Sequence, residues 1–426
     1  MVHQMVHPVM GVRMTAQGSV ARSLWTRRRR ATTRHTRRFS GRAAALAIAL
    51  TGTTIGGMAT PGSAFAGDDE HGFRQVNLVS DLPVAQLLDP QVRNPWGIAL
   101  GPTTPLWVAN EHNPAGCDTC VPTPADLLTK ITLYQGANGR EPISKVNLEV
   151  TASVPTGIVF NPTTSFAVAQ GNVVAPAQFL FNEVVLNAAG NDPLAKITGW
   201  TVASGPLPTT TASTRATKDG SVYTGLALVP AASGDSEHGN AQPILLAVDN
   251  VANTIDVYDG AFNRLEMPGA FVDPDVANMQ PYNVAFLKGR VYVTYGTEGG
   301  GAVSVFSRDG RFIKRLATGA PLVDPWGMTI APDDWGAFGG ALLVGNVDDG
   351  KINAFNRRNG HLLGTISDAH GVPLVNPGLW GLTFGNGTIG TEDTLLFSAG
   401  IGSEVGGFGP DEYAHGLVGL IEPVEH

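Results

Sequence analysis

The residues of this 426-residue chain that could do chemistry are acidic and amide side chains, two histidines and two tryptophans near short apolar segments. Carboxylate and amide oxygens are the ligands that calcium and other hard divalent ions prefer. A calcium-like site is therefore expected to use Glu111, Asp249, Glu298 and Asp348. The full set of candidate ligand-facing residues is Asn94, Trp96, Glu111, His112, Asp249, Glu298, Asp324, Trp326, Asp348, Glu404 and His415.

Several of these residues also have a structural interpretation. Asp348 stands in an Asp-Asp-Gly sequence, which turn chemistry explains without a metal, and Asn253 is interpreted as a turn residue. Adjacent strand residues point to opposite faces, so Glu111 and His112 are not expected to act together and are expected at solvated loop positions. For His415 a structural hydrogen bond is the default, with a catalytic role as the alternative.

The two cysteines, Cys117 and Cys120, lie three residues apart in the sequence GCDTCVP. In an oxidising compartment such a pair forms a small loop disulfide, which is the favoured interpretation. A thioredoxin-like redox pair is one alternative, although it needs a helix N-terminus and the flanks here are Gly and Pro. Half of a zinc site is the other, although no second ligand pair at matching spacing is evident.

Residues 1–66 have the organisation of a secretory signal peptide. They contain ten arginines and no acid, followed by the apolar segment 43–59 and the small-residue sequence SAFA. Cleavage is therefore expected near Ala66, with the mature protein secreted or held in the cell envelope. The apolar segment is too short and too rich in glycine for a stable membrane span. The start codon stays open, as does export by the general or the twin-arginine route.

Removing residues 1–66 makes the chain strongly acidic. The precursor has 28 basic and 36 acidic residues, a formal charge of −8; loss of ten arginines leaves 18 basic residues and a formal charge of −18. Nucleic acids and anionic membranes need a basic patch, so neither is expected as a partner. A partner protein, a glycan or a small molecule remains possible, and residues 67–426 are expected to form one monomeric domain.

One short pattern occurs six times in the mature chain. The copies are NPWGIALGP, VPTGIVFNP, VYTGLALVP, QPYNVAFLK, DPWGMTIAP and GLWGLTFGN, starting at residues 94, 154, 222, 280, 324 and 378. Proline holds the chain extended, and the glycine at the fourth position allows backbones to approach closely. Trp96, Trp326 and Trp380 are interpreted as core residues between repeats, with a stacking platform for a ligand as the alternative.

Each copy of the pattern is followed by three further strand-like segments. Turn sequences such as YQGANG, YDG, SRDG and NRRNG end the third segment and predict a hairpin to the fourth. A period of 44 to 68 residues with four short strands is typical of a β-propeller or a solenoid. Residues 73–80 resemble an outer strand without inner strands before it, and the last repeat lacks one. The prediction is an all-β, six-bladed propeller closed by its N-terminal strand.

Antiparallel strands place the segments entering each innermost strand and the turns between strands two and three on one face. This loop-rich face is expected to collect the candidate residues given above. The sequence lacks a G-x-S-x-G, an H-E-x-x-H and a phosphate-binding loop, so no catalytic residue is assigned.

The motifs NLVSDLP, NPWGIALGP, DPWGMTIAP, LLVGNVDDGKINAF and HGLVGLIEP carry a resemblance over roughly the whole mature chain. The chain resembles uncharacterised secreted bacterial six-bladed propellers of the NHL-like or YVTN-like kind. This resemblance implies a binding protein without established catalysis, acting through the loop-rich face. The alternative is a calcium-like metal-dependent hydrolase, of the lactonase or esterase kind that similar propellers host, with its ion at the propeller axis.

Overall fold

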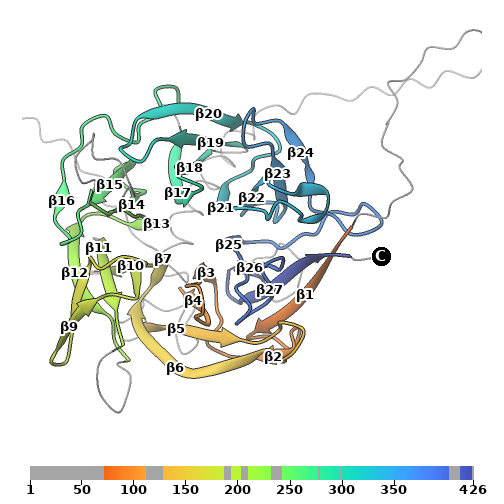
Figure 1. Cartoon of the computed structure of the whole chain (residues 1–426), viewed down its shortest axis with the longest axis horizontal. Coiled ribbons are helices and arrows are strands. Elements are labelled where there is room, and N and C mark those ends of the chain that lie inside the picture. Colours follow the sequence, from red (N-terminus) through yellow and green to blue (C-terminus); the bar gives the residue numbers. More distant parts are fainter. Residues whose placement is uncertain are drawn as a thin grey trace, which may run out of the picture.

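The computed structural model describes residues 72–111, 128–186, 193–202, 210–231, 242–276, 279–297, 300–402 and 413–424. Six four-stranded antiparallel sheets, here called blades I to VI, are arranged in a ring with their first strands nearest the centre (Figure 1). The prediction of an all-β, six-bladed propeller is therefore confirmed. No helix among the described residues is long and apolar enough to cross a membrane.

From the centre outward, blade I contains β3 (Pro95–Ala99), β4 (Leu106–Asn110), β5 (Leu128–Gln135) and β6 (Ser144–Ser153). Blade II contains β7 (Pro155–Phe160), β10 (Phe179–Leu186), β11 (Pro193–Trp200) and β12 (Ser213–Asp219). Blade III contains β13 (Tyr223–Val229), β14 (Ile244–Asp249), β15 (Thr254–Tyr258) and β16 (Arg264–Leu265).

Blade IV contains β17 (Gln280–Leu287), β18 (Arg290–Thr297), β19 (Gly300–Phe306) and β20 (Phe312–Thr318). Blade V contains β21 (Pro325–Ile330), β22 (Leu342–Asn346), β23 (Ile352–Phe355) and β24 (Leu362–Thr365). Blade VI contains β25 (Leu379–Phe384), β26 (Leu395–Ala399), β27 (Leu417–Pro423) and β1 (Phe73–Ser80).

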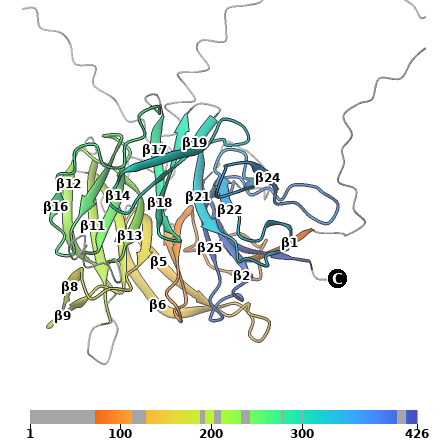
Figure 2. The ribbon, with the colours of Figure 1, turned by 45° about the horizontal axis from the view of Figure 1, so that its top comes forward.

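Three smaller elements lie outside this plan and were not predicted. β2 (Leu87–Leu88) pairs in parallel with β1, and β8 (Ala167–Gln170) and β9 (Val173–Pro176) form a hairpin within the blade II segment. The described residues contain one short 3-10 helix, Gly336–Phe338. The tilted view in Figure 2 shows the strands of neighbouring blades standing side by side around the ring.

The ring is closed by the N-terminal strand. β1 pairs antiparallel with β27 from Phe73 opposite Pro423 to Ser80 opposite Leu417, with one bulge. The predicted outer-strand segment 73–80 therefore completes the last blade as expected. Both ends of the described chain thus belong to one sheet, which leaves no open edge between the first and last blades.

The six-fold pattern forms the innermost strands, and it produces a bulge in each of them. In every blade the pairing between the first and second strands shifts register within the pattern, for example between Pro95 and Ile98. A Cβ atom on Gly97 would lie 2.5 Å from the backbone oxygen of Thr156 in the next blade. The predicted close approach of backbones at this glycine is confirmed, because a side chain there has no room.

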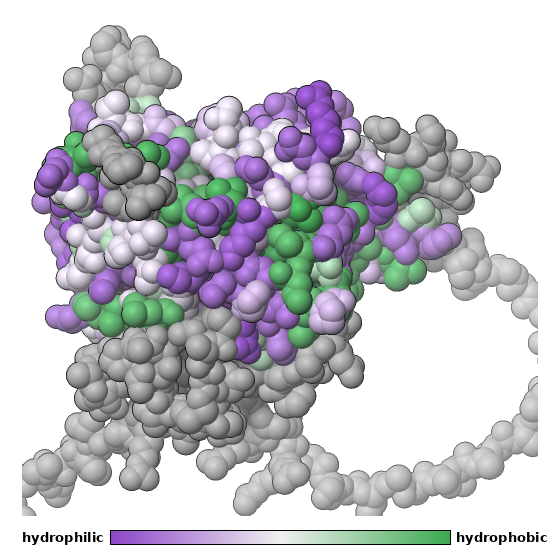
Figure 3. Space-filling model, turned by 90° about the horizontal axis from the view of Figure 1, so that it is seen from below, coloured by the Kyte–Doolittle hydropathy of each residue, from purple (hydrophilic) through white to green (hydrophobic). Residues whose placement is uncertain are grey.

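The hydrophobic core lies between blades rather than in one centre. Six clusters of buried residues each combine side chains from two neighbouring blades, so the apolar faces of every sheet are covered on both sides. The outside of the ring seen in Figure 3 is largely hydrophilic, with apolar residues in separate patches. The packing is therefore that of a closed ring of sandwiched sheets.

Blade III departs from the prediction in its outer strand. The last of the three strand-like segments predicted after the third copy of the pattern is RLEMPGAFV, residues 264–272, but β16 ends at Leu265. Pro268 cannot donate to a ladder, and Gly269 and Phe271 adopt positive φ angles of 80° and 57°. The chain therefore leaves the sheet early and crosses towards blade IV, which opens a gap on the outer side of blade III.

Candidate functional site

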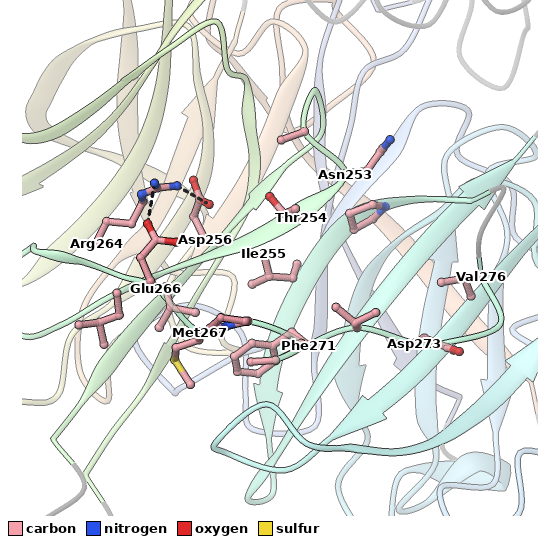
Figure 4. A pocket seen from close by; sticks show the side chains of 18 of the residues that line it. Asn253, Thr254, Ile255, Asp256, Arg264, Glu266, Met267, Phe271, Asp273 and Val276 are labelled. Atoms are coloured by element: carbon pink, nitrogen blue, oxygen red, sulfur yellow. Dashed lines mark hydrogen bonds and ion pairs between the residues drawn. The ribbon is translucent and has the colours of Figure 1, made fainter.

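A groove of about 600 Å³ lies in this gap, between blades III and IV. It is bounded by the β14–β15 turn, by the crossover segment 266–276, and by Pro281 and Tyr295 of blade IV. The turn and the start of β17 both belong to the loop-rich face expected from the sequence. We call this space the III–IV groove (Figure 4).

One end of the III–IV groove carries a network of charges. Lys218 Nζ lies 2.8 Å from Asp249 Oδ2 and 2.7 Å from Asp256 Oδ2. Arg264 contacts Asp256 at 3.5 Å and Glu266 at 2.8 Å, as Figure 4 shows. Burial works to lower the pKa of Lys218, but the two carboxylates outweigh it and raise the pKa above its ordinary value. The lysine therefore stays protonated between two acids.

Two tyrosine hydroxyls extend this network into the blade. Tyr223 donates to Asp256 Oδ2 at 2.6 Å, and its hydroxyl lies 2.7 Å from that of Tyr258. Burial, followed by the hydrogen bonds to Asp256 and Tyr258, raises the pKa of Tyr223 far above its ordinary value. Both phenols thus remain neutral and serve to fix the position of Asp256.

The other end of the III–IV groove is formed by Asp273 of the crossover segment. Arg315 binds it through two hydrogen bonds, from Nε at 2.9 Å and from Nη2 at 2.6 Å, and Ser304 donates at 2.6 Å. Burial alone would raise the pKa of Asp273, but these hydrogen bonds hold it below its ordinary value. Asp273 is therefore ionised and anchors the crossover to blade IV.

Between the two charged ends, the wall of the III–IV groove is apolar. Ile255, Met267 and Phe271 lie there in Figure 4, with Val276 beside Asp273. Tyr295 also lines the groove and is 4% exposed, and burial raises the pKa of its hydroxyl well above the ordinary value. The groove therefore offers hydrogen-bonding groups at both ends of an apolar surface, which is the usual plan of a small-molecule site.

The predicted tryptophans lie elsewhere, at the axis of the ring. Trp96 stacks on Trp380 at 4.3 Å between ring centroids and meets Trp326 edge-on at 5.0 Å. Blades I and V are not neighbours, so Trp96 and Trp326 can meet only at the centre. Both are buried, together with Tyr282 and Tyr413. These side chains are core residues, but they fill the axis rather than a gap between two blades.

Asn94 and Glu111 are joined beside these tryptophans. Asn94 Nδ2 donates to Glu111 Oε2 at 2.8 Å, and Trp380 Nε1 donates to Asn94 Oδ1 at 2.9 Å. Glu111 is 3% exposed, so the expectation that it lies at a solvated position is wrong. Asn94 has a positive φ of 42°, which turns the chain immediately before β3. Asp324 holds the equivalent position before β21, with a φ of 49°.

His415 has the structural hydrogen bond expected of it. Its Nδ1 lies 2.7 Å from Asp81 Oδ2, and Asp81 Oδ1 accepts from the backbone of Gly416 at 2.9 Å. Arg93 Nε lies 3.5 Å from the same carboxylate. The cluster joins the end of β1 to the start of β27, and its role in the described structure is to hold the closing strand.

The residues expected to bind a metal are dispersed where the structure describes them. Asp249 caps the β14–β15 turn, accepting from the backbones of Val251 and Ala252 at 3.0 Å, in addition to its ion pair with Lys218. Asp348 lies in the turn after β22, which confirms the turn interpretation. Among the described residues no three His, Cys, Asp or Glu side chains are grouped so that they could hold a metal ion.

Five of the candidate residues lie outside the described part of the chain. They are His112, Cys117, Cys120, Glu298 and Glu404. The disulfide and the calcium-like site therefore stay predictions.

None of the residues that line the III–IV groove was among the predicted ligand-facing residues, and those missed include Lys218, Asp256 and Tyr295. One signal was present in the sequence. Asp256 interrupts the otherwise apolar strand segment TIDVY, and a charge in such a strand needs a buried partner. The partner, Lys218, lies 38 residues away in another blade, so spacing alone could not identify it.

The fold and the site together define a class: a six-bladed propeller with an aromatic axis and a polar groove between two blades. No protein-family model matches the chain. It is 30% identical over 312 residues to uncharacterized protein R648 of Acanthamoeba polyphaga mimivirus, covering 69% of each chain. It is also 30% identical over 321 residues to uncharacterized protein L690 of the same virus, covering 69% of this chain and 74% of that one. The chain belongs to the family of these uncharacterized proteins.

Solved structures of propeller enzymes show a more distant similarity. The alpha-L-arabinofuranosidase of Fusarium graminearum is 13% identical and has a TM-score of 0.49, with 83% of this chain and 98% of that chain covered. A glucose dehydrogenase is 11% identical with a TM-score of 0.46, covering 82% and 99%. Similarity at this level carries no information about the chemistry of this chain.

Proposed function

We propose that this protein is a secreted propeller that binds a small ligand in the III–IV groove without transforming it. The observation that carries the proposal is the groove itself, whose volume of about 600 Å³ falls within the roughly 300–1,000 Å³ of small-molecule sites. The β14–β15 turn of the loop-rich face forms one of its sides.

The composition of the lining supports binding rather than catalysis. Among the described residues that line the groove there is no histidine, cysteine or serine. The acids and bases present hold one another in ion pairs, and the phenols of Tyr223 and Tyr258 are kept neutral. A general base or nucleophile needs a pKa near the working pH, whereas the pKa values of Lys218, Tyr223 and Tyr258 are raised further above it.

The test is a groove-filling variant and its matched control. Ala252 lines the groove from the exposed β14–β15 turn, so Ala252→Trp should obstruct it without disturbing the core. Val251 is 48% exposed on the same turn but does not line the groove, and Val251→Trp is the control. Both variants are screened by thermal shift against one library of small polar compounds.

The expected result is a set of compounds that raise Tm of the wild type and of Val251→Trp but not of Ala252→Trp. Binding to the native state raises Tm by mass action, so loss of the shift reports loss of the site. A library in which every active compound stabilises both variants equally would place the binding site elsewhere and contradict the proposal.

We also propose that the protein is secreted and that it is related to the NHL-like propellers of bacteria. Cleavage of residues 1–66 would give a single domain over 67–426 that starts at Gly67, related to NHL-like secreted bacterial propellers. N-terminal sequencing of protein recovered from the culture medium should begin at Gly67 or close to it. Retention of the intact precursor inside the cell would contradict secretion. Thiol alkylation with and without reductant tests the Cys117–Cys120 disulfide on the same material.

A further inference from the structure

We propose that the ligand of the III–IV groove is a neutral saccharide, recognised on the groove floor by the hydroxyl of Tyr295. This inference rests on the proposed function, because it names the ligand class of the same groove. Three features support this inference. They are the ion pairs at both ends of the groove, the Tyr295 hydroxyl, which makes no hydrogen bond with the described residues, and the apolar wall between the charged ends.

Every cation at the III–IV groove already has an acidic partner. Lys218 is held by Asp249 and Asp256, Arg264 contacts Asp256 and Glu266, and Arg315 is held by Asp273. A charged ligand would have to compete with one of these pairs, and separating a partly buried pair leaves an uncompensated charge. A neutral ligand can instead use the hydrogen-bonding capacity that the pairs leave over.

Sugar hydroxyls match that spare capacity. A hydroxyl both donates and accepts, so neighbouring hydroxyls of one ring can accept from Arg264 and donate to Asp256 or Glu266. The side chain of Arg264 is 44% exposed and that of Glu266 is 79% exposed, so both are open to a ligand. The charge network is thus suited to a ligand with many hydroxyls and no net charge.

Tyr295 supplies an independent observation. Its side chain is 4% exposed and lines the groove, yet its hydroxyl makes no hydrogen bond with the residues that the structure describes. Because no described residue uses the hydrogen-bonding capacity of this hydroxyl, a ligand can both donate to it and accept from it. The hydroxyl lies close enough to Asp273 and Arg315 to feel both charges. It therefore marks the position of one polar group of the ligand.

The wall between the charged ends suits the remaining surface of a sugar. Ile255, Met267 and Phe271 form an apolar strip there, and Leu265 and Val272 are 37% and 55% exposed. The C–H faces of a pyranose are apolar, so they can cover this strip while the hydroxyls reach the groups at either end.

The ligand class is tested with three sugars that differ in charge: glucose, glucuronate and glucosamine. They are titrated calorimetrically into the mature protein at a pH where glucuronate is an anion and glucosamine a cation. Glucose should bind at least about fivefold more tightly than either charged sugar, since each of those must disturb an ion pair worth up to about 1 kcal/mol. Tighter binding of glucuronate or glucosamine, or no binding of glucose, would overturn the saccharide assignment.

The role of Tyr295 is tested by Tyr295→Phe with Tyr292→Phe as the control. Tyr292 lies on the same strand and is buried to a similar degree, but it packs between blades IV and V and does not line the groove. Tyr295→Phe should weaken glucose binding about fivefold to tenfold and leave Tm unchanged or slightly raised, because the lost hydroxyl has no partner in the protein. Tyr292→Phe should leave binding unchanged.

Loss of Tm in Tyr295→Phe with unchanged binding would show a structural role and overturn the inference. Failure of this inference is distinguishable from failure of the proposed function. If Ala252→Trp abolishes the Tm shift of other library compounds while glucose does not bind, the groove is a binding site for another ligand class. If Ala252→Trp leaves both glucose binding and the Tm shifts of the library compounds intact, both proposals are wrong.

Discussion

Two junctions between neighbouring blades are built in opposite ways. Between blades VI and I, Trp380 stacks on Trp96, and its indole donates to the buried Asn94 amide. Between blades III and IV, the inner part is packed in the same manner, but the outer part is a polar groove with ion pairs on both sides. The first junction is apolar near the axis, whereas the second leaves a polar groove at its outer part.

The difference follows from how the chain connects the blades. Blade VI is assembled from both ends of the described chain, and β1 is held to β27 by noncovalent contacts alone. If those contacts fail, the ring opens between blades VI and I. Blades III and IV are joined directly by the segment after β16, so their spacing is limited by the chain itself. A groove is therefore tolerated at a junction that does not close the ring.

The largest expected effect comes from removing the closing strand. Deletion of residues 73–80 takes away the outer strand of blade VI and the buried Leu78 and Val79, and it exposes the edge of β27. We expect no cooperative thermal transition by circular dichroism and strong aggregation. A cooperative melt of the deleted protein would show that closure by β1 is not needed for folding.

The second largest effect is expected from substitutions of Trp380 at the axis of the ring. Trp380 is fully buried, and Trp380→Ala should lower the free energy of unfolding by about 3–5 kcal/mol through loss of packing and of the bond to Asn94. Trp380→Phe keeps most of the stacking surface and should cost about 1–2 kcal/mol. Chemical denaturation measures both. Equal, small losses would mean that the axial aromatic cluster does not stabilise the closed ring.

The features that repeat along the chain could be predicted from the sequence. The innermost strands, the hairpins after the third strands and the closing strand 73–80 depend on local apolar runs and turn residues. The innermost strands and the hairpins occur in several copies, so one irregular copy does not hide the pattern, and the segment 73–80 resembles the outer strands of later repeats. The outer strand of blade III was predicted to continue through residues 264–272, whereas Pro268 and Gly269 prevent the ladder from continuing beyond Leu265.

The candidate site could be predicted only in its general position. The β14–β15 turn, which forms one side of the III–IV groove, belongs to the loop-rich face expected from the sequence. The III–IV groove itself depends on where one outer strand stops and on partners such as Lys218 and Asp256 from different blades. Glu111 was wrongly expected to be solvated, because its burial depends on the positive φ of Asn94, which turns the amide towards it. Contacts of this kind join residues from different parts of the chain, so the spacing of residues in one sequence does not predict them.

A smaller effect is expected at the III–IV groove. Lys218→Met leaves Asp249 and Asp256 without their shared cation, and should lower the free energy of unfolding by roughly 2 kcal/mol, since the lysine is 24% exposed. The loss should shrink as salt is added, because screening weakens the repulsion between the two acids. Lys288→Met, at an exposed position in the turn between β17 and β18, is the control. A loss as large as that of Trp380→Ala would remove the contrast between the two junctions.

The Asp273–Arg315 pair makes the stability of the junction between blades III and IV depend on pH. Because the pKa of Asp273 is lowered in the folded state, its contribution is present above the unfolded pKa of about 3.9 and is lost as the pH falls through the folded pKa. Arg315→Met should therefore cost about 1 kcal/mol near neutral pH and less as the pH falls below about 4. Urea denaturation at several pH values, with Arg290→Met as control, measures the difference. A loss that is constant with pH would contradict it.

The smallest expected effect concerns the surface of the closing strand. Arg74 of β1 and Glu422 of β27 form an ion pair, but their side chains are 66% and 30% exposed. Water screens such a pair, and ordering two long side chains costs entropy, so Arg74→Ala should change the free energy of unfolding by no more than about 0.5 kcal/mol. Deletion of β1 and loss of this ion pair affect the same pairing of strands. If Arg74→Ala were as damaging as Trp380→Ala, closure would depend on surface charge rather than on buried packing, and the difference between the two junctions would need another cause.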